Sequence, residues 1–240
     1  MKIFAMAMAF ACAATTGSAA TISVSDFSAS AFQATATSFG ATITEDFEGF
    51  AEGVHAVGTP TAVGTFATIG GKGSGGTVTK SGFANDGTTL TVRDGNVFGR
   101  RSTTAILTAD ASKDKFLDSN DTHGIAWTAS LGGAWLDKIL LTVRDGAEFG
   151  AKMHITVDGD SVSFAGKGDG DTRLVLIDFG TAVQSSDITF ANLNGANRLT
   201  NDGFSIDDVT LSIVPLPTSS LLLLAGLGGL GAMKRRRKTA

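Results

Sequence analysis

Short runs of alternating apolar and polar residues, each closed by an Asp-Gly pair, recur through the body of this chain. The clearest are Thr89–Arg93 before Asp94-Gly95, Ile139–Arg144 before Asp145-Gly146, and Met153–Val157 before Asp158-Gly159. Alternation with a period of two predicts β-strands with one buried face, and Asp-Gly favours tight hairpin turns. Further runs of this kind occupy 162–164, 174–179, 188–190 and 204–213.

No stretch has the helical periodicity and length that would predict an amphipathic helix with any clarity. Glycine is abundant, at 31 residues, whereas proline occurs only three times, which suits a chain of strands and turns. Many short strands joined by regular turns predict an all-β fold. The expected architecture is a two-sheet antiparallel sandwich with jelly-roll topology, flanked by an N-terminal signal peptide and a C-terminal hydrophobic sorting helix.

The first 20 residues have the organisation of a secretory signal peptide. Lys2 supplies a small positive region, Ile3–Ala14 is apolar, and Gly17-Ser18-Ala19-Ala20 offers small residues for cleavage after Ala19 or Ala20. The apolar stretch is too short for a retained membrane helix. We therefore expect a signal peptide over residues 1–20.

The last 27 residues combine three features in a fixed order. A short motif, Val214-Pro215-Leu216-Pro217, precedes an apolar segment over 218–233 and the basic cluster Lys234, Arg235, Arg236, Arg237 and Lys238. The apolar run 221–233 spans about 20 Å as a helix, short of a hydrocarbon core about 30 Å thick. Basic residues beside such a segment stay cytoplasmic, so the body is expected on the far side of the membrane.

This tail resembles the VPLPA-type variant of PEP-CTERM sorting signals, found on exported proteins of Gram-negative bacteria that make exopolysaccharide. The resemblance implies recognition by an exosortase, a membrane cysteine transpeptidase, with processing near the proline motif. The family's usual alanine after the second proline is Thr218 here. The alternative is an ordinary tail-end membrane anchor. In both cases the tail indicates where the protein is delivered, and it gives no information on its activity.

Removal of both signals leaves an acidic body without cysteine, residues 21–213, of a size that suits one domain. The whole chain has 19 basic and 23 acidic residues, and Lys2 with the five tail cations accounts for six of the 19, which leaves 13 against 23. Such a charge argues against nucleic acid or an anionic membrane as partner of the body. The single cysteine, Cys12, leaves with the signal peptide, so no disulfide is expected.

One ten-residue run occurs twice. Leu90–Gly99 returns 51 positions later as Leu141–Gly150, although the flanking residues do not align. Two equivalent hairpin entries explain this echo better than a duplicated domain. Arg93 and Arg144 are then expected on faces of the same kind, as solvated or locally paired side chains.

The final strand carries a break in its alternation. Phe204 and Ile206 are apolar at even positions, whereas Val209 and Leu211 are apolar at odd ones. Because side chains alternate strictly between the two faces of a strand, this change of parity predicts a β-bulge at Asp207-Asp208.

An early Glu45–Phe50 segment together with the late Asp202–Leu211 segment resembles the framing strands of carbohydrate-binding-module-like and MAM-like jelly rolls. That resemblance implies adjacent first and last strands and a structural calcium ion. Glu48 with Asp207 or Asp208 would then supply hard oxygen ligands. The alternative is that these carboxylates are solvated or cap turns.

Three functional classes follow. The first is a non-catalytic surface or extracellular-matrix protein, with signal peptidase and exosortase as partners in export, exopolysaccharide as a further partner, and a transient membrane stage. The second is a carbohydrate-binding module, with Trp127 and Trp135 as glycan contacts. The third is a glycan hydrolase, although no GxSxG, HExxH or mature cysteine supports an enzyme. We expect no enzymatic activity.

Overall fold

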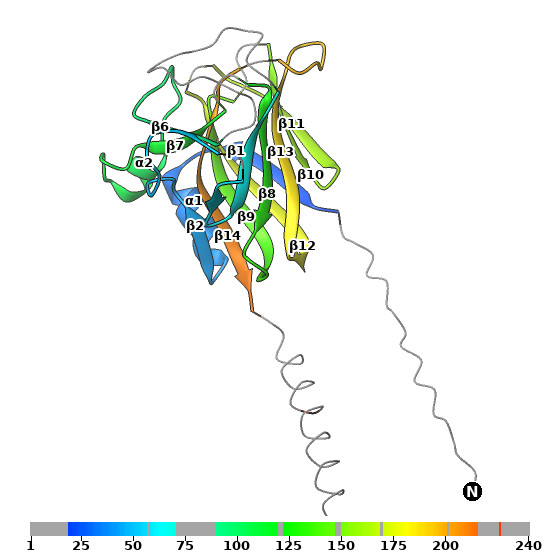
Figure 1. The fold of residues 1–240 in the computed structure, drawn as a ribbon. Helices are drawn as coiled ribbons and strands as arrows, with labels where there is room; N and C mark the ends of the chain where they lie inside the picture. Colours follow the sequence, from blue (N-terminus) through cyan, green and yellow to red (C-terminus); the bar gives the residue numbers. More distant parts are fainter. Residues whose placement is uncertain are drawn as a thin grey trace, which may run out of the picture.

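Two antiparallel β-sheets packed face to face form the body, as predicted. The structure, a computed structural model, describes residues 19–56, 58–70, 90–119, 122–146, 150–168, 170–200, 202–215 and 226. Strands make up 55% and helices 9%. The chain is therefore an all-β sandwich, and Figure 1 shows its two layers.

Sheet A is the larger layer, with the order β1-β12-β9-β14-β7-β6-β3 and with β2 also paired to β14. Its strands are β1 (Thr21–Asp26), β2 (Thr42–Glu45), β3 (Gly53–His55), β6 (Leu90–Asp94), β7 (Lys115–Asp118), β9 (Trp135–Arg144), β12 (Thr172–Val183) and β14 (Ser205–Val214). The last strand, β14, therefore lies in the middle of this sheet.

Sheet B has the order β11-β10-β13-β8-β5-β4. Its strands are β4 (Pro60–Thr61), β5 (Gly64–Ile69), β8 (Gly124–Ser130), β10 (Lys152–Val157), β11 (Asp160–Ala165) and β13 (Ser185–Leu193). The β10–β11 connection is the two-residue turn Asp158-Gly159, with φ values of 48° and 100°. Positive φ at both residues is what a type I′ hairpin needs, so the predicted Asp-Gly hairpin is confirmed here.

The main core lies between the sheets. Sheet B contributes Phe66, Trp127 and Ile188, which face one another across β5, β8 and β13 and are each at most 2% exposed. Sheet A contributes Ile139, Leu141 and Val143 of β9 among others. Burial of this apolar surface is the main stabilising term for a domain without disulfides.

Two helices occur where the sequence predicted none. Helix α1 (Ala29–Ser38) places Phe32 against Leu140 and Leu174 on the outer face of sheet A, and α2 (Thr104–Thr108) is a short helix. The hydroxyl of Ser28 accepts a hydrogen bond from the Ala31 amide and caps α1. Helix α1 was missed because its threonines favour strands and Phe32 is its one fully buried residue.

Both ends of the body lie at one end of sheet A. Thr21 of β1 pairs with Asp178 of β12, which pairs with Lys138 of β9, and Val214 of β14 pairs with Trp135 of β9. We call the region around Trp135 and Lys138 the chain-end side. Ala20, which precedes β1, and Pro215, which follows β14, are thus joined to the same side of the sandwich.

Candidate functional site

The β-bulge predicted at Asp207-Asp208 is confirmed. Between the pairs Asp207–Thr142 and Thr210–Leu140, β14 advances three residues while β9 advances two. Asp208 has a φ of 51°, a left-handed conformation that aspartate tolerates better than most residues. As a result both carboxylates are buried, Asp207 at 2% and Asp208 at 4% exposure.

Hydroxyl and amide donors from Ser102, Thr103 and Thr104 hold the two carboxylates. Oδ2 of Asp207 accepts from the Ser102 hydroxyl at 2.6 Å and from the Thr103 amide at 2.8 Å. Asp208 accepts from the Thr103 hydroxyl at 2.5 Å and from the Thr104 hydroxyl at 2.8 Å. This Ser-Thr-Thr segment was not predicted, because no sequence pattern links it to strands a hundred residues away.

Burial makes the charged form of both acids unfavourable. It raises the pKa of Asp207 well above its usual value, and the neighbouring Asp208 charge raises it further. Burial also raises the pKa of Asp208, against the opposing effect of the Thr103 and Thr104 hydroxyls. A substrate has no access to carboxylates that are buried this deeply. The role of the pair is structural, because its hydrogen bonds join β14 to the segment 102–104.

Glu48, the third predicted calcium ligand, is held by other contacts. Its Oε1 accepts from the Lys115 amide at 3.0 Å, while the Lys115 ammonium donates to the Glu48 and Phe50 carbonyls. Burial raises the pKa of Glu48. Its charge also raises the pKa of Asp208, so the two groups interact at a distance.

These carboxylates are arranged as hydrogen-bond acceptors, which does not fit a bound calcium ion. Calcium takes six to eight oxygen ligands. Here both oxygens of Asp208 and Oδ2 of Asp207 already accept hydrogen bonds from Ser and Thr hydroxyl groups. Oδ1 of Asp207 is buried and accepts no hydrogen bond from the described residues. Nowhere among the described residues do three His, Cys, Asp or Glu side chains gather as a metal site.

A second buried charge cluster joins β6 and β7. The Arg93 and Arg100 Nε atoms each lie 3.2 Å from a different oxygen of Asp118, and all three side chains are at most 5% exposed. Arg144 occupies the position in the repeated ten-residue run that corresponds to Arg93. Its side chain is half-buried and donates hydrogen bonds to the Gly99 carbonyl and the Thr172 hydroxyl. Both arginines are locally paired, one of the two predicted alternatives.

The predicted glycan contacts occupy different surroundings. Trp127 is 2% exposed, stacks on Phe66 at a centroid distance of 5.0 Å, and donates its Nε1 hydrogen to the Val63 carbonyl. A ring enclosed in this way offers no face to a sugar, so the structure gives Trp127 a core role in place of the predicted platform. Trp135 is half-buried and lies at the chain-end side.

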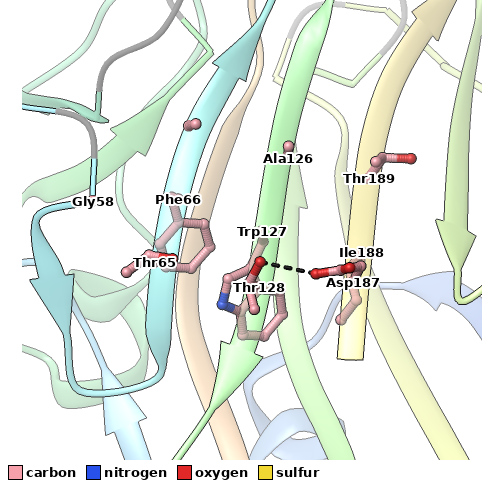
Figure 2. A pocket seen from close by; sticks show the side chains of 10 residues that line it. Gly58, Thr65, Phe66, Ala126, Trp127, Thr128, Asp187, Ile188 and Thr189 are labelled. Carbon is pink, nitrogen blue, oxygen red and sulfur yellow. Dashed lines mark hydrogen bonds between the residues drawn. The ribbon is translucent and has the colours of Figure 1, made fainter. Parts of the chain in front are cut away.

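A shallow hollow of about 230 Å³ lies on sheet B over the same strands (Figure 2). Thr65 pairs with Thr128, which pairs with Asp187, and the Thr128 hydroxyl donates to the Asp187 carboxylate at 2.8 Å. Because these residues alternate with buried Phe66, Trp127 and Ile188, they face outward. The hollow thus has a polar rim, and Ala67 and Ala126 also line it.

Only the start of the predicted sorting motif lies in the described part. Val214 ends β14 and Pro215 follows it, whereas Leu216, Pro217 and the cluster 234–238 lie outside the described residues. In the part of the chain that is described, no helix has the length and hydropathy needed to cross a membrane.

Comparison with known proteins adds no identity. No family model matches the sequence, and no curated protein matches it.

Proposed function

We propose that this protein is an exported, non-catalytic surface or extracellular-matrix protein of a Gram-negative bacterium, sorted by an exosortase-type system linked to exopolysaccharide. The observation that carries this proposal is the presence of two delivery signals, one at each end of a single all-β body. During sorting, segment 218–233 holds the chain in the inner membrane with Lys234–Lys238 in the cytoplasm. We further propose jelly-roll connectivity for this two-sheet body.

The positions of the two ends support a tethered stage. Thr21 and Val214 both lie at the chain-end side, which therefore faces the membrane while the tail is anchored. The opposite end of sheet A, with Arg144 and Ser205, then points outward. A body attached in this way clears the membrane without unfolding β14, since Pro215 follows directly after the strand.

The composition of the body supports the same proposal. Its net charge of about −10 follows from 13 basic and 23 acidic residues and favours solubility outside the cell. The buried pair Asp207-Asp208 and the Arg93–Asp118–Arg100 cluster both serve the fold. Neither offers an accessible reactive group.

Proline substitution tests the sorting proposal. In a host that carries an exosortase, the double variant Pro215→Ala, Pro217→Ala is expected to keep its tail and accumulate in the inner membrane. The matched control is Pro60→Ala, which changes the remaining proline of the chain, in β4. The C-terminal peptide and the cell fraction of each protein are measured. Equal processing of the double variant and the wild type would contradict the proposal.

A second candidate function is carbohydrate binding at the sheet B hollow. The supporting observation is its outward polar rim of Thr65, Thr128 and Asp187, since hydroxyl and carboxylate groups bind sugar hydroxyls. This site replaces Trp127 as the candidate contact.

Retention on the producing organism's exopolysaccharide tests this candidate, with calcium and then with a chelator. Saturable retention that Thr128→Val abolishes and the exposed sheet A control Thr42→Val preserves would support a binding module. Failure of the wild-type protein to bind in either buffer would contradict it and leave the structural role.

A further inference from the structure

The backbone just before β1 makes a contact between the two sheets. The amide nitrogen of Ala20 lies 3.0 Å from Oδ2 of Asp160. Ala20 precedes β1, the edge strand of sheet A, whereas Asp160 begins β11, the edge strand of sheet B. A polar contact at this point closes the sandwich along one side.

Packing changes abruptly at the same position. Ala20 is partly buried and packs against the main core together with Ile22 and Val24, whereas Ala19 is exposed. The folded body therefore begins at Ala20. The far end of β1 is held independently, because Asp26 accepts from Lys167 and Arg173 at 2.8 Å.

The surroundings of Ala20 are acidic. Asp158 and Asp160 line one hollow with Ala19 and Ala20, and Asp178 lines a neighbouring one with Thr21. Asp158 is engaged by Ser186 and the Asp187 amide, and Asp178 has Lys138 at 3.9 Å. Asp160 is the carboxylate that the Ala20 nitrogen contacts, and a positive charge at this nitrogen would complement it.

We infer that signal peptidase hydrolyses the Ala19–Ala20 bond, so that the mature chain begins with an α-ammonium group paired with Asp160. This inference rests on the proposed export. Small residues at positions −1 and −3 permit cleavage after Ala19 (Ala19 and Gly17) or after Ala20 (Ala20 and Ser18). The packing of Ala20 and its contact with Asp160 favour cleavage after Ala19. The signal peptide would then end one residue before the boundary at Ala20 predicted from the sequence.

The chemistry of the step is simple hydrolysis. Water adds to the Ala19 carbonyl carbon, the carbon–nitrogen bond breaks, and the released Ala20 amine takes up a proton. A neutral amide hydrogen bond to Asp160 thereby becomes a charge-assisted one, which is stronger. Cleavage one residue later would remove Ala20 from its packed position and move the charge to Thr21, which is paired with Asp178 in the sheet.

Mass analysis of the N-terminal peptide of the exported protein tests the inference. The expected first residue is Ala20. A chain that begins at Thr21 would overturn the cleavage site while leaving export intact. A chain that still begins at Met1 would overturn the proposed export as well, so the two failures are distinguishable.

Thermal unfolding tests the ion pair separately. Pairing with Asp160 favours the protonated ammonium and so raises the pKa of the Ala20 amino group in the folded protein. The stabilisation from the ion pair is therefore fully present below the unfolded-state pKa of about 7.7–8.0, and it is lost as the pH rises through the folded-state pKa. Asp160→Asn is therefore expected to lower the Tm of the Ala20-started protein at about pH 6.5, with the difference narrowing at about pH 9.5. In a control with one extra residue before Ala20, the difference should not narrow. The same pH dependence in both proteins would overturn the pairing.

Discussion

At the scale of single residues, the buried pair Asp207-Asp208 most directly links the sequence to the properties of the fold. Both carboxylates are buried on β14. Asp207 accepts hydrogen bonds from Ser102, Thr103 and Thr104, and Asp208 accepts them from Thr103 and Thr104. The change of parity along β14 was enough to predict the bulge. The donors could not be predicted, because a Ser-Thr-Thr run resembles any turn or helix start until the fold brings it to β14.

The acid pair predicts an unusual pH dependence of stability. Burial raises the pKa of Asp207 in the folded chain, so the folded state binds its proton more tightly than the unfolded chain, where aspartate titrates near 3.9. The free energy of unfolding therefore falls as the pH rises from about 4 through the folded-state pKa of Asp207.

Asp207→Asn removes this titration and keeps an oxygen to accept from Ser102 and Thr103. Its free energy of unfolding, measured in urea, should decline less than that of the wild type between about pH 4.5 and 7.5. The exposed outer-face variant Asp187→Asn is the control and should keep the wild-type slope. Equal slopes for all three proteins would refute a raised pKa at Asp207.

Trp127 is predicted to stabilise the core. Its ring is 2% exposed and stacked on Phe66, so Trp127→Ala should cost about 3–5 kcal/mol of the free energy of unfolding. Trp135→Ala, at a half-buried position, should cost clearly less. Urea denaturation of both variants decides the matter, and a fully stable Trp127→Ala protein would be the contrary result.

At the scale of elements, local sequence signals predicted β6 and the strands from β9 to β14. They missed the other described strands, β1 to β5, β7 and β8, and both described helices. The β10–β11 hairpin could be predicted because its signals are local. The turn Asp158-Gly159 and the alternation of its two flanking strands lie next to each other in the sequence. Helix α1 depends instead on Leu140 and Leu174, which lie far away in the sequence and cover Phe32 only after sheet A has formed. Leu140 also explains the unbroken apolar run in β9, because this strand is covered on both faces.

The pairing of β6 with β7 depends on a buried charge cluster. Asp118→Ala would leave Arg93 and Arg100 buried without their carboxylate, which typically costs about 3–5 kcal/mol. The control, Asp26→Ala, removes an exposed carboxylate paired with Lys167 and Arg173, and its cost in the free energy of unfolding should be clearly smaller. Similar losses for both variants in urea denaturation would contradict the distinction between buried and exposed pairs.

At the scale of the whole molecule, the sequence predicted the two-sheet sandwich but not which acids meet inside it. The resemblance to calcium-binding jelly rolls implied Glu48, Asp207 and Asp208 as ligands, yet these groups bind protein donors here. We therefore expect the Tm of the mature protein to be the same with calcium and with a chelator. A Tm that falls with the chelator and returns with calcium would restore the calcium hypothesis.

The cysteine content of the chain allows a direct test of the proposed export of the body. Cys12 is the single cysteine, and the proposed export would remove it with the signal peptide, so the mature wild-type protein should carry no thiol. Ser185→Cys places one thiol at an exposed position of β13. A maleimide coupled to a polymer too large to cross the outer membrane reports whether that thiol is accessible on intact cells or in their medium.

We expect Ser185→Cys to be labelled without lysis and the wild type to stay unlabelled before and after lysis. Labelling of Ser185→Cys only after lysis would contradict delivery of the body to the surface or the medium. Labelling of the wild type through a retained Cys12 would contradict removal of the signal peptide.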